Sequence, residues 1–409
     1  MRNLATWLRY ATKNVFRNRR RALVTVLIGA VGTGAILVAT GFASFSFDML
    51  VYFTTRESGH IIIAHKDYWS REEGTPLEMG LENYQDLVAE IEKDPRVEAA
   101  VARIWFTGLA SNGQKSVIYI AEGVEPRQFA LLGPSRTIIE GRFLSQKPSK
   151  EGGYEAILGK DLGKGLKAGP GGGLTLLATT AQGSLNALDV DVKGIFSTGF
   201  QELDKRLLYI HLDTAQELLQ SKKVSKIVVF LHKTEDTDAV YRSLRQKFPR
   251  LGFRLWEEEA SYYRAMKGLY DRAFGIMGGI IIVMVFFATS NTMSMAVVER
   301  TREIGTERAM GAFPGEIVRN FALEAAVMGA GAVLLGMALA GLVAWIFATA
   351  DLQMPPPPMR LEGYPLRLSF NPGTWALTSM VMVGIFVSAA WFASRRAAHT
   401  PIVEALSHV

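Results

Sequence analysis

The sequence has no cysteine among its 409 residues, so no disulfide can stabilise its fold. It also has no G-x-x-x-x-G-K-[ST] loop, which excludes ATP hydrolysis by that machinery, and no G-x-S-x-G nucleophile elbow. The six histidines are scattered, without carboxylates at metal-ligand spacing. We therefore expect no catalytic residue, no metal site and no cofactor in this chain, and we assign the histidines structural roles.

Charge is absent from four long runs, each of 26 or 27 residues without Asp, Glu, Lys or Arg. About 20 apolar residues are enough to cross the hydrocarbon core of a bilayer. The predicted fold class is an α-helical membrane protein with four transmembrane helices, one followed by three, and a large mixed α/β extracytoplasmic domain between the first two. The runs are Ala22–Phe47, Ala273–Val298, Ala325–Ala350 and Leu368–Ser394.

Positive charge is concentrated before the first run, where residues 1–21 hold seven basic side chains and no acidic one. Short basic segments beside a span stay in the cytoplasm, so both chain termini are expected there and the insertion outside. The net charge of +6 is therefore an orientation signal rather than a nucleic-acid-binding face. Because a cleaved signal peptide has a shorter apolar region, we expect the first run to remain as an anchor.

Apolar residues recur at helical spacing within 1–21, which predicts an amphipathic helix. We favour the membrane surface as its location, with packing on a partner protein as the alternative. The expected membrane-surface residues are Trp7, Arg17, Arg19, Arg20 and Arg21. The chain is then divided into 1–21 (cytoplasmic helix), 22–47 (first span), 48–272 (α/β domain with stalk helices at both ends), 273–298 (second span), 299–320 (cytoplasmic loop), 321–350 (third span), 351–367 (short outer loop), 368–394 (fourth span) and 395–409 (cytoplasmic tail).

Short β-like runs alternate with helical ones in the insertion, which predicts a mixed α/β domain of one or two lobes. The strands are expected near 60–64, 116–120, 174–178, 190–195, 207–210 and 226–231, and the helices near 81–93, 214–221 and 237–248. Small residues in the first and third spans predict close helix packing. These are Gly29, Gly32, Gly34, Gly329 and Gly336.

The segment Asn291–Ala312 reads N-T-M-S-M-A-V-V-E-R-T-R-E-I-G-T-E-R-A-M-G-A. Gly311 can end a helix by adopting a positive φ, and Pro314 with Glu316 can open the next one. The pattern predicts a short, charged helix lying parallel to the membrane. A solvated loop whose charges only keep it in the cytoplasm is the alternative.

This segment resembles the signature that follows the second span in permeases of the MacB, LolC/LolE and FtsX superfamily of ABC transporters, where E-R-x-x-E-I-G and A-x-G-A recur. Three other regions, Asn14–Arg21, Gly194–Leu219 and Arg395–Leu406, are similar as well. The resemblance covers essentially the whole chain and is greatest to LolC/LolE-type permeases of the bacterial inner membrane.

The resemblance implies a permease dimer, of identical or different chains, with two cytoplasmic ATPase subunits that bind ATP and Mg. Because no fused ATPase precedes the first span, a separate partner would supply it. The permease would pass ATP-driven motion to its periplasmic domain, to extract or export a lipoprotein or another amphiphile among membrane lipids. The expected ATPase-coupling residues are Glu299, Arg300, Arg302, Glu303, Ile304, Arg308, Met310 and Gly311.

Two alternatives remain open within the same resemblance. One is MacB-like efflux of small amphiphiles with a periplasmic adaptor. The other is an FtsX-like signalling scaffold that activates cell-wall hydrolases without transport, although the insertion here is larger than the usual FtsX one. In each case the chain itself is not an enzyme and has no nucleic-acid partner.

Overall fold

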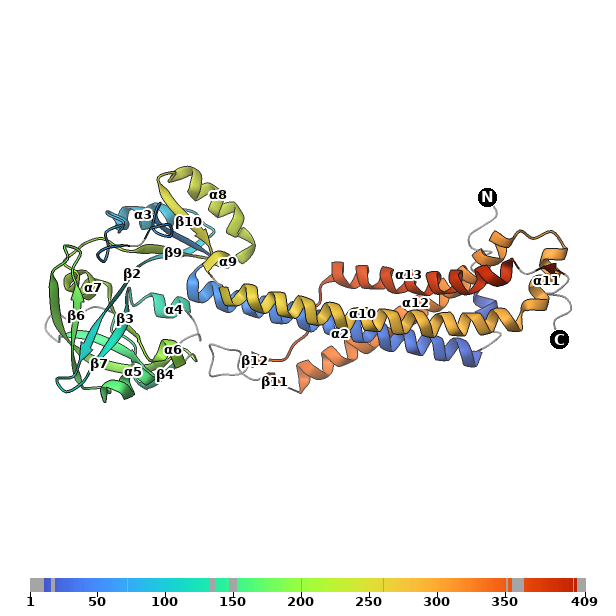
Figure 1. Cartoon of the computed structure of the whole chain (residues 1–409), viewed down its shortest axis with the longest axis horizontal. Coiled ribbons are helices and arrows are strands. Elements are labelled where there is room, and N and C mark those ends of the chain that lie inside the picture. Colours follow the sequence, from blue (N-terminus) through green and yellow to red (C-terminus); the bar gives the residue numbers. More distant parts are fainter. Residues whose placement is uncertain are drawn as a thin grey trace. The chain divides into compact units, whose positions relative to one another are not determined.

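The computed structural model describes residues 11–15, 19–71, 73–132, 137–146, 153–199, 201–259, 261–350, 352–354, 364–399 and 401–402. Trp7, Arg17 and most of the expected N-terminal helix lie outside these residues. The chain divides into two compact units (Figure 1). The helical unit contains Met1–Asp48, Met266–Leu352 and Pro365–Val409, and the α/β unit contains Met49–Ala265 with Gln353–Tyr364.

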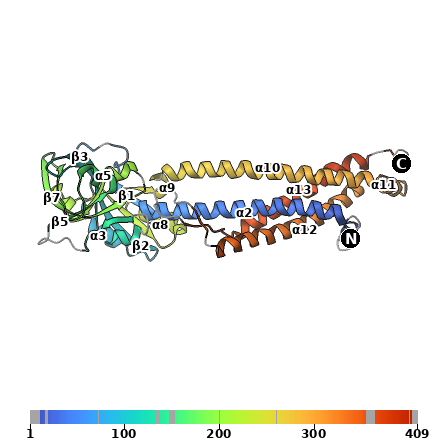
Figure 2. The same cartoon turned by 90° about the horizontal axis from the view of Figure 1, so that it is seen from below.

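Four described helices are long and apolar enough to cross a membrane (Figure 2). They are α2 (Arg19–Ser58), α10 (Ser261–Glu299), α12 (Pro314–Thr349) and α13 (Pro372–Ala398). Helices α2 and α10 contain the first two uncharged runs completely, whereas α12 and α13 contain most of the third and fourth runs. Both helices that border the insertion are longer than their runs, since α2 continues to Ser58 and α10 begins at Ser261. Between α12 and α13 lie two short strands, β11 (Gln353–Met354) and β12 (Tyr364–Pro365).

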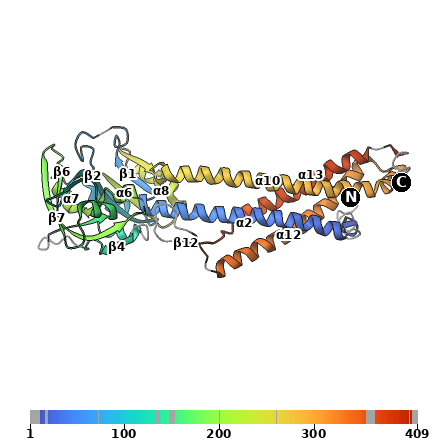
Figure 3. The same ribbon diagram turned by 60° about the horizontal axis from the view of Figure 1, so that its bottom comes forward.

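The four helices pack around a common apolar core in the helical unit. Val285 of α10, Ala332 of α12 and Phe386 of α13 are buried there, and Val26 of α2 packs against them. Figure 3 shows α12 passing close to α2 and diverging from it toward Thr349. Small residues at the crossing let the helix backbones approach, which is how helices associate where lipid provides no hydrophobic driving force.

A ten-stranded sheet forms the described α/β unit, in the order β10-β1-β9-β2-β3-β8-β5-β7-β4, with β6 paired to β2 and β7. The strands are β1 (Ile61–His65), β2 (Val97–Ser111), β3 (Ser116–Val124), β4 (Thr137–Gly141), β5 (Tyr154–Gly159), β6 (Gly173–Thr179), β7 (Leu185–Ser197), β8 (Leu207–His211), β9 (Lys226–Leu231) and β10 (Leu251–Leu255). The helices are α3 (Tyr84–Ile91), α4 (Gln128–Leu132), α5 (Lys160–Leu166), α6 (Gln201–Asp204), α7 (Leu212–Leu218), the 3₁₀ turn η2 (Thr234–Asp236), α8 (Thr237–Lys247) and α9 (Trp256–Glu259).

The first lobe of this unit follows a β-α-β-β-α-β pattern formed by β1, α3, β2, β9, α8 and β10. Its strands stand in the order β10-β1-β9-β2, and every neighbouring pair is antiparallel. Helices α3 and α8 pack on one face, since Val88 and Val240 share a core with Ile61 and Val229. The elements from β3 to β8 form a second lobe between β2 and β9. The long strand β2 belongs to both lobes.

The chain enters and leaves the sheet through neighbouring strands. After α2, Gly59 turns into β1 with a φ of +77°, and a Cβ at this position would lie 2.0 Å from Val228 Cγ1, so only glycine fits. Strand β1 pairs with β10, with Ile61 opposite Leu255, and α9 follows β10 at once. The end of α2 and the segment leading to α10 therefore meet the same edge of the sheet.

Candidate functional site

The segment after α10 folds into the short helix α11 (Thr301–Ala309). Gly311 ends it with a φ of +102°, and its N–H donates to the Arg308 carbonyl at 3.0 Å. Helix α12 then opens at Pro314, where the Phe313 N–H donates to Glu316 Oε2 at 3.1 Å. The predicted roles of Gly311, Pro314 and Glu316 at these helix ends are confirmed.

Helix α11 is attached to the helical unit by its apolar side. Ile304 is 5% exposed and packs in a cluster with Val297 of α10, Ile317 and Phe321 of α12, and Ala398 of α13. Burial of one such side chain stabilises a contact by about 1.5–3 kcal/mol. Movement of α11 would thus act on the ends of α10, α12 and α13 together.

Arg300 joins α11 to α12 through a buried ion pair. Its Nη1 lies 2.9 Å from Oε1 of Glu324, a residue of α12 with a side chain only 9% exposed. The Arg300 Nε also pairs with Glu303 Oε2 at 3.1 Å, and the guanidinium lies 5.2 Å from the Phe321 ring centre. Burial acts to lower the pKa of Arg300, but the two carboxylates outweigh it and the net shift is upward. Arg300 therefore stays charged in a partly buried position.

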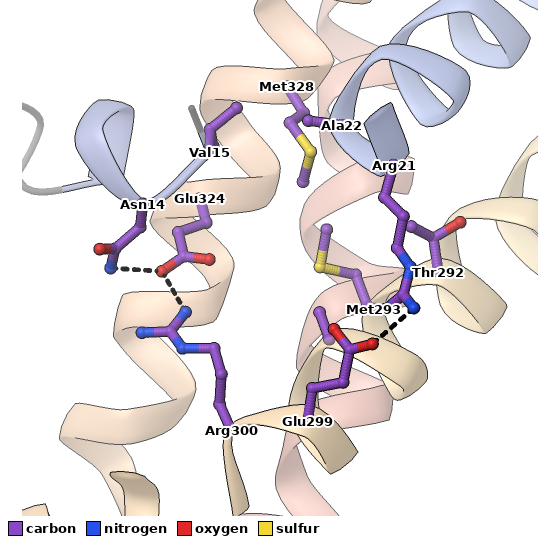
Figure 4. Close-up of a pocket in the computed structure, with 11 residues that line it drawn as sticks. Asn14, Val15, Arg21, Ala22, Thr292, Met293, Glu299, Arg300, Glu324 and Met328 are labelled. Atoms are coloured by element: carbon purple, nitrogen blue, oxygen red, sulfur yellow. Dashed lines mark hydrogen bonds and ion pairs between the residues drawn. The ribbon is translucent and has the colours of Figure 1, made fainter. Parts of the chain in front are cut away.

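A cavity of about 120 Å³ adjoins this ion pair (Figure 4). Asn14 Nδ2 donates to Glu324 Oε1 at 2.8 Å from one side, and Arg21 at the start of α2 pairs with Glu299 at 2.5 Å on the other. Arg21 Nη1 is buried and has no hydrogen-bond partner among the described residues. The volume has room for about four water molecules, which could serve such a donor. The N-terminal segment, α2, α10 and α12 thus share one polar cluster.

The outer side of the segment carries two large apolar side chains that are mostly exposed. Met310 is 77% exposed and Phe313 is 73% exposed, and both lie outside the four uncharged runs. Arg302 is exposed as well, the Glu303 side chain is 46% exposed, and Arg308 is half-buried. Exposed apolar side chains beside charges are typical of a surface that binds another protein. Sequence reasoning missed Phe313, although an aromatic between Gly311 and Pro314 was a usable signal.

The structure separates the expected coupling residues into two groups. Glu299, Arg300 and Ile304 contact residues of their own chain, whereas Arg302 and Met310 face outward. Sequence reasoning also missed Glu324 and took it only as the boundary of an uncharged run. Arg19 and Arg20, expected at the membrane surface, are exposed at the start of α2.

The five glycines expected at helix contacts all lie where another helix is near. A Cβ on Gly29 would lie 2.3 Å from Phe386 Cζ, and one on Gly336 would lie 2.6 Å from Thr33 Cβ. Gly32, Gly34 and Gly329 have neighbours within 2.6, 3.3 and 3.1 Å of such an atom. Helix α10 differs, because a Cβ on Gly275 or Gly279 would meet nothing within 4 Å. In its most apolar 18 residues, 11% are buried within the chain, against 39% for α2.

The described residues hold no group of three or more His, Asp or Glu arranged to bind a metal ion.

Four apolar helices, an α/β domain inserted between the first two and a short attached helix after the second define a class of membrane permease. Residues 22–247 match the family model of the MacB-like periplasmic core domain, and residues 275–402 match that of the FtsX-like permease C-terminal region. The chain belongs to this MacB- and FtsX-like family of ABC transporter permeases.

Individual relatives extend this finding. The chain is 26% identical over 353 residues to the lipoprotein-releasing system transmembrane protein LolC of Xylella fastidiosa, which covers 82% of this chain and 83% of that protein. It is 23% identical to LolE of Haemophilus influenzae, covering 71% of this chain and 70% of LolE. The crystal structure of the periplasmic region of MacB from Actinobacillus actinomycetemcomitans matches 50% of this chain and 92% of its own, with 13% identity and a TM-score of 0.37.

Proposed function

We propose that this chain is the permease subunit of an inner-membrane ABC transporter that moves a lipoprotein or another amphiphile out of the membrane. The N- and C-termini and α11 lie in the cytoplasm, and the α/β unit lies in the periplasm. A separate ATPase dimer binds ATP and Mg and drives the cycle. The observation that carries the proposal is α11: it is fixed to three spans by Ile304 and Arg300 and exposes Met310 and Phe313 beside it.

The ATPase contact is assigned to Arg302, Arg308, Met310 and Phe313. Apolar anchors in a charged surround are what protein interfaces place at their centre. Glu303 is a weaker choice than the sequence suggested, because its carboxylate holds Arg300 at 3.1 Å. Reversing its charge would disturb the buried ion pair as well as any partner contact.

A second permease copy, identical or paralogous, is assigned to the open side of α10. Gly275 and Gly279 are four residues apart, and a Cβ on either would meet nothing within 4 Å, unlike one on Gly329 or Gly336 of α12. Small residues at this spacing allow two membrane helices to pack closely. The low buried share of α10 supports the same assignment.

Lipoprotein release is favoured over small-molecule efflux by the extent of the similarity. The LolC relative covers 82% of this chain and 83% of its own length, whereas the macrolide export protein MacB of Shewanella sp. covers 63% of this chain and 40% of its own length. The four uncharged runs also hold no His or Tyr, so no ionisable residue marks an aqueous path along them. This absence suits a lipid-anchored substrate.

The test is a charge placed on the exposed apolar surface. We expect Met310→Glu with Phe313→Glu to reduce recovery of the ATPase on the tagged permease by about tenfold or more, since an interface anchor contributes about 2 kcal/mol or more. ATP-dependent release of a fluorescent lipoprotein from proteoliposomes should fall in parallel. Leu185→Glu is the matched control, because Leu185 is 79% exposed on β7 of the α/β unit.

Unchanged ATPase recovery in the double variant would refute the assigned contact. A second contrary result would be a wild type that recovers the ATPase and hydrolyses ATP without releasing lipoprotein. If it then released a small amphiphile only with an adaptor, the substrate would be that of an efflux transporter.

A further inference from the structure

Arg103 lies at the point where β2 passes from one lobe of the α/β unit to the other. It is opposite Lys226 of β9 in the ladder of the first lobe and opposite Val124 of β3 in the ladder of the second. No other β2 residue occurs in both of these ladders. The backbone of Arg103 therefore belongs equally to the two lobes.

The Arg103 side chain is 7% exposed and makes three kinds of contact, each with a different element. Nη1 lies 3.1 Å from Oε1 of Glu122 on β3, whose side chain is also 7% exposed. Nε donates to Gln128 Oε1 of α4 at 2.8 Å. Nη1 and Nη2 both donate to the carbonyl oxygen of Glu57 at 3.2 Å.

The Glu57 carbonyl belongs to the last turn of α2, where helix carbonyls have no partner within the helix. A guanidinium at this position also interacts favourably with the negative end of the helix dipole. Arg103 thus acts as a buried cap on α2, and the planar fork can hold a carbonyl, a carboxylate and an amide at once. Replacement by lysine would supply the charge but not that geometry.

A second contact between the same two elements has a different character. Arg56 of α2 pairs with Glu98 of β2 at 2.7 Å, but the two side chains are 20% and 25% exposed. Glu98 lies in the first-lobe half of β2, so this pair reaches one lobe only.

We propose that Arg103 is a positioning residue that fixes the end of α2 to both lobes of the α/β unit, so that a displacement of α2 moves the lobes together. The proposal rests on the proposed function, because it describes how motion driven by the ATPase would reach the substrate-handling domain. Neither Arg103 nor Glu122 touches a substrate in this assignment.

The experiment removes the contacts of the Arg103 side chain while the α/β unit stays folded. In Arg103→Met alone the Glu122 carboxylate is left buried without its partner, so that variant is expected to unfold at a lower Tm. The paired variant Arg103→Met/Glu122→Leu replaces two buried charges by apolar side chains, and we expect it to lose less Tm than Arg103→Met alone. It still loses the donors to the Glu57 carbonyl and to Gln128 Oε1, so coupling is measured below its Tm, where a loss does not come from misfolding.

Two readouts are measured on the full chain in its complex with the ATPase. Because the chain has no cysteine, Thr54→Cys on α2 and Gln114→Cys in the turn after β2 accept one spin label each. Without nucleotide, we expect a narrow distance distribution between the labels, which broadens and shifts in the paired variant but not in the control Arg56→Gln. Lipoprotein released per ATP should fall about threefold or more in the paired variant, the size of effect known for residues that carry coupling.

A distribution as narrow in the paired variant as in the wild type would overturn the proposal. So would an unchanged ratio of release to ATP. The distance readout needs no transport, so failure of the wild type to release lipoprotein would count against the proposed function alone and leave the distance result to decide the role of Arg103.

Discussion

Two buried arginine–carboxylate pairs, one in each unit, have different surroundings. Arg300 and Glu324 in the helical unit adjoin a cavity of about 120 Å³, and the Arg300 side chain is 19% exposed. Arg103 and Glu122 in the α/β unit are each 7% exposed and lie between strands, with a carbonyl and an amide as further partners. The first pair has open space beside it, and the second is almost completely covered by protein atoms. We infer that the helical unit can change its polar contacts during a cycle, while the α/β unit keeps its own.

The largest expected effect comes from removing each carboxylate in turn. Glu122→Leu should lower the free energy of unfolding by about 3–5 kcal/mol, because Arg103 is then buried without its ion-pair partner. Glu324→Leu should cost less, about 1–2 kcal/mol, since Arg300 keeps Glu303 and is closer to water. Thermal unfolding of the two purified variants in the same detergent measures the difference. Equal losses would remove the distinction between the two pairs.

The helix that follows Arg300 could be predicted from the sequence, but the partners of Arg300 could not. From Glu299 to Gly311 a dense run of charges follows an apolar run, and the helix end at Gly311 could be predicted from local chemistry alone. The partners could not. Asn14 and Glu324 are 310 residues apart, and Glu324 stands at the edge of an uncharged run, where a charge is expected to mark the end of a span rather than to be buried by pairing.

Part of the α/β unit was also predictable from the sequence. All six predicted strands overlap observed ones, because each is a short β-branched or apolar run between turn residues. Strands β4, β5 and β10 were missed, and so was the longest strand, β2. Its first half is buried on both faces, as Ala100 and Val101 are both fully covered, so it lacks the alternation that marks a half-exposed strand. Arg103 also interrupts the apolar pattern of the strand, so the residue that connects the two lobes could not be predicted.

Lowering the pH should destabilise the α/β unit, because a buried histidine of that unit, His60, resists protonation. His60 is 3% exposed, its Nδ1 accepts the Leu231 N–H at 3.1 Å, and its Nε2 lies 3.2 Å from Thr234 Oγ1. A backbone N–H can only donate, so Nδ1 carries no proton in the folded state. Burial, and secondarily the Arg56 charge, lower the pKa of His60 to about 4.

The folded state therefore resists a proton that the unfolded chain accepts at its ordinary pKa of about 6.5. The contribution of neutral His60 is complete above that pH and is lost as the pH falls toward 4, with a maximum loss of about 3 kcal/mol. The Tm of the full chain measured between pH 7 and 4 tests this. In His60→Asn the Oδ1 atom can accept the same N–H without titrating, so its Tm should fall less over that range. Parallel curves for the two proteins would contradict the assignment.

The smallest expected effect concerns how the helical unit is held together. The α/β unit has a large apolar core, whereas the helical unit has a smaller one and adds close backbone approach at glycine. In Gly336→Ala the new Cβ would lie 2.6 Å from Thr33 Cβ and 2.9 Å from the Ala30 carbonyl oxygen, and a backbone atom cannot move aside as a side-chain end can. Overpacking of this kind costs about 1–3 kcal/mol.

Gly341→Ala on the same helix is the matched control, because its Cβ would meet nothing within 4 Å. Alanine favours the helical backbone over glycine by about 1 kcal/mol, so this control should be neutral or stabilising. Gly336→Ala is thus expected to lower the Tm of the detergent-purified permease, and Gly341→Ala to leave it unchanged or raise it. A lower Tm in Gly341→Ala than in Gly336→Ala would mean that α12 does not pack on α2 through Gly336, and that the span is held by the ion pair of Glu324 instead.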